Sequence, residues 1–118
     1  TGWHLVRESV DGLMDHAPSA ECRADIQKIL DEFTAREGGA LKIHGVRARV
    51  AGHVTHVAFH VLVPGTWTVR EGHDLLEEIE GRFHDHFGHI VVDTHLEPIE
   101  DPRSYDAPQW ENATPAPD

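Results

Sequence analysis

Apolar residues recur at helical spacing in the first third of the chain. Ser19 is suited to cap a helix, and an apolar stripe follows it along one side of the segment (Ile26, Ile29, Leu30 and Phe33). Gly38 and Gly39 predict the end of this helix. Residues 1–18 show a similar spacing that is cut short by a glycine and a proline, so they predict a short helix or an ordered lead-in.

After Leu41 the period of the pattern changes to two. Leu41 and Ile43 alternate with polar residues, Gly45 interrupts the alternation, and it resumes over residues 46–50, which predicts a first strand. A second strand follows the turn at Gly52, with side chains alternating between two faces (Val57, Phe59, Val61 and Val63 on one; His56, Ala58, His60 and Leu62 on the other). A hairpin is the natural connection between these strands.

A second helix is predicted by the capping-box spacing of Thr68 and Glu71, after Pro64 and Gly65 end the second strand. Its apolar stripe contains one histidine (Val69, His73, Leu76, Ile79, Phe83 and Phe87). Gly88 ends this helix, and alternation resumes in a third strand (Ile90, Val92 and Thr94 against Val91, Asp93, His95 and Glu97).

The predicted order is therefore α-β-β-α-β, which favours an α+β two-layer sandwich with both helices on one face of a three-stranded sheet. The crossover through the second helix allows the last two strands to be parallel. Five of the seven prolines fall in the last 21 residues, so residues 99–118 are expected to be a disordered tail. The folded domain is expected to span residues 19–98.

Charge and composition narrow the possible partners. The net charge is −11 with only ten basic residues, which argues against nucleic acid. Eleven histidines favour divalent transition metals, and the single cysteine, Cys22, excludes both an intrachain disulfide and a zinc site of four thiolates. No apolar run approaches the roughly 20 residues needed to span a bilayer, and no signal peptide is apparent.

Five candidate metal ligands come from the three strands and the start of the second helix (His44, His60, His73, His95 and Glu97). His95 and Glu97 are two residues apart, so they share a strand face. His73 interrupts an apolar stripe, where a neutral imidazole needs a partner for its ring nitrogens. Asp93 is interpreted as a solvated strand residue.

Weaker metal sites and enzymatic functions are also considered. His84, His86 and His89 lie in the segment RFHDHFGH, but no pair has ideal helical metal spacing, so they predict at most an accessory site, as do His53 and His56. Cys22 is interpreted as a packing or exposed thiol. No nucleophile signature and no HEXXH motif is present, so we expect no enzyme. A small metal-dependent hydrolase is the least favoured alternative.

Four stretches together resemble one family: ESVDGLMD (Glu8 to Asp15), IHGVRARVAG (Ile43 to Gly52), FHVLVPGTWTVREGHDLLEEIE (Phe59 to Glu80) and THLEP (Thr94 to Pro98). They resemble the cytoplasmic C-terminal domain of the cation diffusion facilitator metal efflux transporters. The resemblance implies a metallochaperone-like, ferredoxin-like fold that forms a homodimer. It also implies that residues 1–18 lead in from a membrane helix that this chain does not include.

By this resemblance, His44, His60, His73, His95 and Glu97 match positions that bind metal at or near the dimer interface in zinc-transporting members. Zn²⁺ is the expected ion, and other divalent transition metals are possible. The implied function is to sense metal on the cytoplasmic side of the inner membrane and to modulate the transmembrane domain through a closed dimer. The alternative is a free-standing metal buffer or chaperone.

Overall fold

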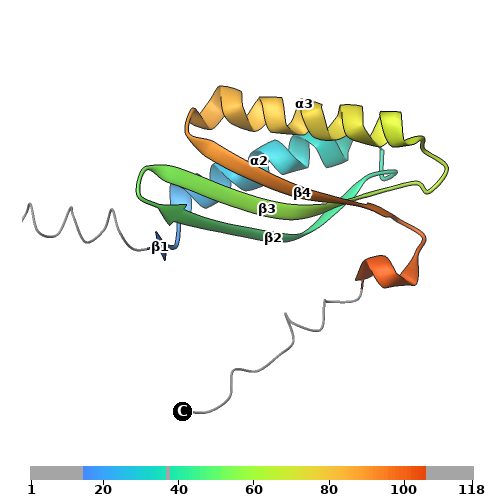
Figure 1. Cartoon of the computed structure of the whole chain (residues 1–118), viewed down its shortest axis with the longest axis horizontal. Coiled ribbons are helices and arrows are strands. Elements are labelled where there is room, and N and C mark those ends of the chain that lie inside the picture. Colours follow the sequence, from blue (N-terminus) through green and yellow to red (C-terminus); the bar gives the residue numbers. More distant parts are fainter. Residues whose placement is uncertain (1–14, 37, 106–118) are drawn as a thin grey trace, which may run out of the picture.

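The computed structural model describes residues 15–36 and 38–105. The elements in these ranges are β1 (Asp15–His16), α2 (Ala20–Arg36), β2 (Lys42–Ala51), β3 (Val54–Val63), α3 (Val69–Phe87), β4 (Ile90–Pro98) and the 3-10 helix η1 (Pro102–Tyr105) (Figure 1). From α2 to β4 the order is the predicted α-β-β-α-β, so the α+β fold class is confirmed. The helix or lead-in expected before β1 lies outside the described residues.

The strands form one sheet in the order β1-β2-β3-β4. β2 pairs antiparallel with β1 and with β3, whereas β4 pairs parallel with β3. The parallel pairing agrees with the crossover connection through α3. The edge strand β1 was not predicted, because two residues are too few to show a period of two.

Both helices begin at side chains that cap their first turn. The Ser19 hydroxyl accepts a hydrogen bond from the Cys22 backbone N–H at 3.1 Å. Thr68 and Glu71 form a reciprocal capping box, with bonds of 3.1 and 3.0 Å. Such caps contribute about 1 kcal/mol each. The two helix starts predicted from the sequence are confirmed.

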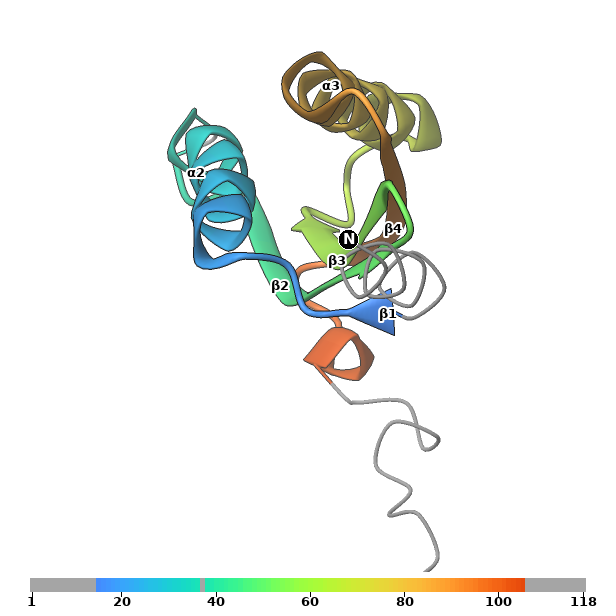
Figure 2. The same cartoon turned by 90° about the vertical axis from the view of Figure 1, so that its left-hand side faces the viewer.

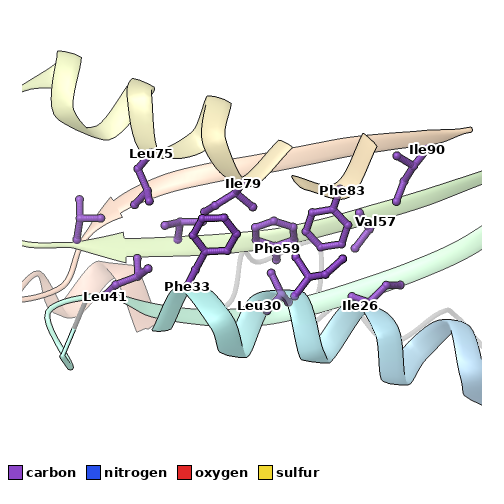
Figure 3. Packing of buried hydrophobic residues seen from close by; sticks show 13 residues of the cluster. Ile26, Leu30, Phe33, Leu41, Val57, Phe59, Leu75, Ile79, Phe83 and Ile90 are labelled. Atoms are coloured by element: carbon purple, nitrogen blue, oxygen red, sulfur yellow. The ribbon is translucent and has the colours of Figure 1, made fainter. Parts of the chain in front are cut away.

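α2 and α3 cover the same face of the sheet, and the hydrophobic core lies between the two layers (Figure 2). The core joins both helices to β3 through fully or almost fully buried side chains (Figure 3; Ile26, Ile29, Leu30, Val57, Phe59, Val61, Ile79 and Phe83). We call the opposite side of the sheet the open face. Strand alternation places His56, Ala58 and His60 of β3 and Val91, Asp93 and His95 of β4 on it.

The buried stripe of α3 differs in phase from the predicted one. It consists of Gly72, Leu75, Ile79 and Phe83, while Val69 is 86% exposed and His73 is also exposed. A Cβ atom at Gly72 would overlap the side chain of Leu96 in β4. The helix therefore approaches β4 through its glycine, which turns His73 away from the sheet. The prediction that His73 interrupts the buried stripe is wrong.

The chain continues in ordered structure beyond β4, contrary to the predicted start of a disordered tail. The Ile99 N–H donates to Val63 O at 2.8 Å, and the Ser104 hydroxyl donates to Pro98 O at 2.6 Å. η1 then lies on the side of the sheet away from the helices (Figure 2). Proline suits the start of a short helical turn, so proline content alone did not distinguish this turn from disorder. Residues 106–118 lie outside the described residues.

The close approach of α3 to β4 predicts that Gly72→Ala destabilises the domain. The added methyl group would overlap Leu96, and overpacking of this kind costs about 1–3 kcal/mol of unfolding free energy. Gly81→Ala is the matched control, because Gly81 lies in the same helix with open space around it. Alanine there should leave stability unchanged or raise it by up to about 1 kcal/mol. Urea denaturation measures both, and equal stabilities would contradict the proposed role of Gly72.

Candidate metal centre

Three histidines from three neighbouring strands form a row across the open face. His44 of β2 is paired with His60 of β3, and His60 is paired with His95 of β4. The ring centroids of His44 and His60 are 5.2 Å apart, and those of His60 and His95 are 5.4 Å apart, both in edge-to-face contact. Sheet pairing therefore gathers three imidazoles that lie far apart in the sequence.

A β-bulge in β2 puts His44 on this face. His44 lies opposite His60 while Arg47 lies opposite Ala58, so β2 contains one extra residue between them. Gly45, inside the bulge, has a φ of 64°, which glycine adopts without strain. The extra residue places His44 and Arg47 on the same face although they are three positions apart. The interruption at Gly45 in the sequence pattern is this bulge.

Glu97 supplies a carboxylate beside the row. Its Oε1 lies 3.3 Å from Nδ1 of His60 and 3.3 Å from Nδ1 of His95, and its Oε2 lies 3.8 Å from Nε2 of His44. The side chain is 17% exposed, and Oε2 is buried with no hydrogen-bond partner in the described part of the chain. A buried carboxylate oxygen that lacks a partner is costly, so this position favours a cation.

The contact with Glu97 also sets the tautomer of His60. An ionised carboxylate only accepts hydrogen bonds, so the proton must be on Nδ1 of His60 for this bond to form. A divalent cation that replaces this proton could bind Nδ1 of His60 and Oε1 of Glu97 together, because their separation of 3.3 Å fits two ligands of one tetrahedral zinc ion.

We call His44, His60, His95 and Glu97 the histidine–glutamate cluster. Within residues 15–36 and 38–105, His44, His60 and Glu97 form the one group of three donors whose ligand atoms lie within 4.8 Å of one another. The fourth member, His95, adjoins them through Glu97, and its side chain is 72% exposed. Zinc binds four such donors at about 2.0–2.2 Å, so the cluster offers the number and kind of ligands that one zinc ion needs.

His73 is not part of this cluster. It lies near the start of α3, and this helix covers the side of the sheet opposite the open face (Figure 2). Its Nε2 is 3.8 Å from Oε1 of Glu77, and both side chains are exposed. Among the described residues, His73 is not in the group of donors that lie within 4.8 Å of one another.

The other candidate ligands form no comparable group in the described ranges. His84 lies 3.6 Å from Glu80, and His86 lies 3.2 Å from Asp25, so these two histidines contact different carboxylates. Burial raises the pKa of the Cys22 thiol, and the negative charge of Asp25 raises this pKa further. Both effects disfavour the thiolate form that binds metals.

One residue beside the cluster was not predicted from the sequence. The ring of Tyr105, at the end of η1, makes an edge-to-face contact with His44, with centroids 5.8 Å apart and planes at 88°. No pattern indicated this contact, because the proline-rich composition of the segment predicted a tail.

Comparison with known proteins shows which family the chain resembles. The family model described as cation efflux protein, cytoplasmic domain, matches residues 18–99. An uncharacterized transporter of Synechocystis sp. is 43% identical over 109 residues, which are 92% of this chain and 34% of that protein. The manganese efflux system protein MneS of Bacillus subtilis is 28% identical over 100 residues, which are 85% of this chain and 33% of that protein. The chain thus spans about a third of the length of these relatives.

Solved structures share the fold. The zinc form of CzrB, a proposed zinc transporter, has a TM-score of 0.64 and 31% identity, covering 75% of this chain and 97% of that chain. The metal-bound C-terminal domain of the CzcD transporter from Thermotoga maritima has a TM-score of 0.59 and 21% identity, covering 71% and 99%. In the described part of this chain, none of the helices has the length and apolar character needed to cross a membrane.

The family model extends from just before α2 to just after β4, which is the whole α-β-β-α-β unit that carries the histidine–glutamate cluster. Three of the four sequence stretches that resemble cation diffusion facilitators lie within the matched residues, so the resemblance to this family is confirmed there. The chain belongs to the family of cytoplasmic domains of cation efflux proteins.

Proposed function

We propose that this domain binds a divalent cation, preferably zinc, at His44, His60, His95 and Glu97. The observation that carries the proposal is the buried Oε2 of Glu97, which lacks a hydrogen-bond partner among the described residues and lies beside the histidine row. The relatives do not share one ion, since CzrB was solved in a zinc form and MneS is named for manganese. Three imidazoles and one carboxylate suit zinc better than manganese, which prefers oxygen-rich sites.

His73 is proposed as a further ligand at a homodimer interface. Since it lies on the other side of the sheet from the cluster, it would have to act with donors of a second protomer. Two chains of net charge −11 repel each other, and divalent ions at or near their interface would reduce this repulsion. Metal binding would therefore favour a closed dimer.

In the full-length transporter, such a domain would sense metal on the cytoplasmic side of the inner membrane and modulate transport. In this mechanism the closed dimer binds metal more tightly than the open dimer. Metal therefore shifts the equilibrium toward the closed dimer, and with it the equilibrium between conformations of the membrane domain. The relatives are transporters or transporter domains, which favours this function over a free-standing buffer, a chaperone or a hydrolase.

Zinc titration followed by calorimetry should show saturable binding that depends on the cluster. Glu97→Gln keeps the size of the side chain and removes its charge, so it should weaken zinc binding by about tenfold or more, and His60→Ala by more still. His84→Ala is the matched control, because His84 contacts Glu80 outside the cluster. Binding that survives Glu97→Gln but is lost in His84→Ala would move the metal to the segment RFHDHFGH and contradict the proposal.

The affinity for zinc should fall as the pH is lowered below about 6. Protons then compete with the metal for the imidazole lone pairs, so the dissociation constant should rise steeply between about pH 7 and about pH 5.5. Repeating the titration across this range measures the effect. A dissociation constant that does not change would exclude histidine as the main ligand.

Zinc should also make the dimer more compact, which small-angle X-ray scattering detects as a smaller radius of gyration. His73→Ala should retain binding at the cluster but reduce this compaction, because His73 would act between protomers. His84→Ala again serves as the control and should compact like the wild type. A zinc-saturated dimer with the dimensions of the metal-free dimer would contradict closure.

A further inference from the structure

We propose that Tyr105 is a positioning residue for His44, and that residues 99–105 form a strap that holds this ligand ready for metal. The inference rests on the proposed metal binding and extends it to a segment after β4. We assign Tyr105 a role in holding His44 and not in binding the metal, because its hydroxyl group donates a hydrogen bond to the backbone.

The strap is fixed to the sheet at its start and near its end. The carboxylate of Glu100 accepts a hydrogen bond from the Gly65 backbone N–H at 2.7 Å, which ties the strap to the loop after β3. The Ser104 hydroxyl donates to Pro98 O at 2.6 Å, and Ser104 is only 7% exposed. These bonds turn the chain back on itself, so η1 lies beside the open face instead of continuing the line of β4 (Figure 2).

Tyr105 is held at one end and contacts His44 with its ring. Its hydroxyl donates to Ile99 O at 2.7 Å, across the base of the strap. The ring therefore has a defined position, from which it meets the His44 ring edge to face at 5.8 Å. Tyr105 is 51% exposed, so this hydrogen bond and the contact with His44 are what hold its ring beside the imidazole.

The strap lies beside a buried leucine of β3. Leu62 alternates onto the open-face side of β3 and is fully buried, yet it lies outside the main core cluster between the helices and the sheet. Leu62, His44 and Tyr105 line one shared hollow beside β2. Tyr105 of the strap and the buried Leu62 therefore border the same hollow as the proposed ligand His44.

Among the three cluster members that lie closest together, His44 depends most on such support. His60 is hydrogen-bonded to Glu97 and is 19% exposed, whereas His44 is 37% exposed and lies 3.8 Å from Glu97, beyond hydrogen-bond range. It also precedes Gly45, a glycine with a positive φ of 64° inside the bulge. The orientation of His44 therefore rests on ring contacts with His60 and Tyr105.

Holding His44 in place lowers the entropy that metal binding must remove. A ligand side chain that is free to change rotamer must be ordered when the metal binds, and the cost reduces affinity. Tyr105 limits this freedom before the metal arrives. The strap would thereby set the affinity of the centre without adding a ligand.

The test compares zinc affinities of variants in the strap. Tyr105→Ala should weaken binding about three- to tenfold, because the aromatic contact is lost. Tyr105→Phe keeps the ring but loses the hydrogen bond to Ile99 that anchors it, so its effect should be smaller than that of Tyr105→Ala, about two- to threefold. Arg103→Ala is the matched control, because Arg103 is exposed in the same strap, pairs with Asp101, and should bind zinc like the wild type.

A double-mutant cycle with His44→Ala separates positioning from a general effect on the fold. If Tyr105 acts through His44, then Tyr105→Ala should have no additional effect on zinc affinity in the His44→Ala background. An equal loss in both backgrounds would overturn the inference. If Tyr105→Ala lowers the thermal stability markedly, Tyr105→Leu replaces it in the cycle. The new side chain keeps an apolar group beside Leu62 but lacks the aromatic ring.

The experiment also distinguishes this inference from the proposed function. Absence of zinc binding by the wild-type chain, or binding unaffected by His60→Ala, would overturn metal binding at the cluster and the strap with it. Cluster-dependent binding in the wild type together with an unchanged affinity in Tyr105→Ala would overturn the strap alone.

Discussion

The contact between the Glu97 carboxylate and the histidine row is the interaction on which the proposed metal centre depends. Removing a carboxylate from water costs several kcal/mol unless charge or hydrogen bonds compensate it. Here Oε1 is compensated by His60, while Oε2 is buried without a hydrogen-bond partner among the described residues. Protonated imidazoles can supply the missing positive charge at low pH, and a divalent cation can supply it when the imidazoles are neutral. Protons and metal therefore compete for the same stabilising role.

The fold brings this carboxylate to the row through the parallel pairing of β3 with β4. That register sets His60 beside His95 and Leu62 beside Glu97. Leu96, between the two β4 ligands, points to the other side, where Gly72 of α3 lies against it. Packing of the crossover helix against Leu96 thus fixes the segment of β4 that carries His95 and Glu97. This short segment connects the core on one side of the sheet with the proposed site on the other.

The sequence predicted those parts of the site that follow from strand periodicity. The spacing of His95 and Glu97 gave their shared face, and the change of alternation at Gly45 marked the bulge that brings His44 onto it. The buried stripe of α3, and with it the face on which His73 lies, was predicted wrongly. Two stripes that differ by one residue near the helix start both fit α3, and the choice between them depends on the close approach of Gly72 to Leu96. That contact is tertiary and leaves no local signal. Tyr105 was missed for a similar reason, since hydrogen bonds decide the path of the strap.

The core and the metal centre lie on opposite sides of the sheet, and this arrangement suits a sensor. The buried apolar cluster between the helices and the sheet contains none of the proposed ligands, whereas the four members of the histidine–glutamate cluster lie on the other side of the sheet. In small zinc domains without such a core, the free energy of metal binding is used to fold the chain. Here the core supplies the folding free energy separately. The free energy of metal binding can therefore favour one of two folded conformations over the other. A domain that signals the metal concentration to another part of a transporter requires this property.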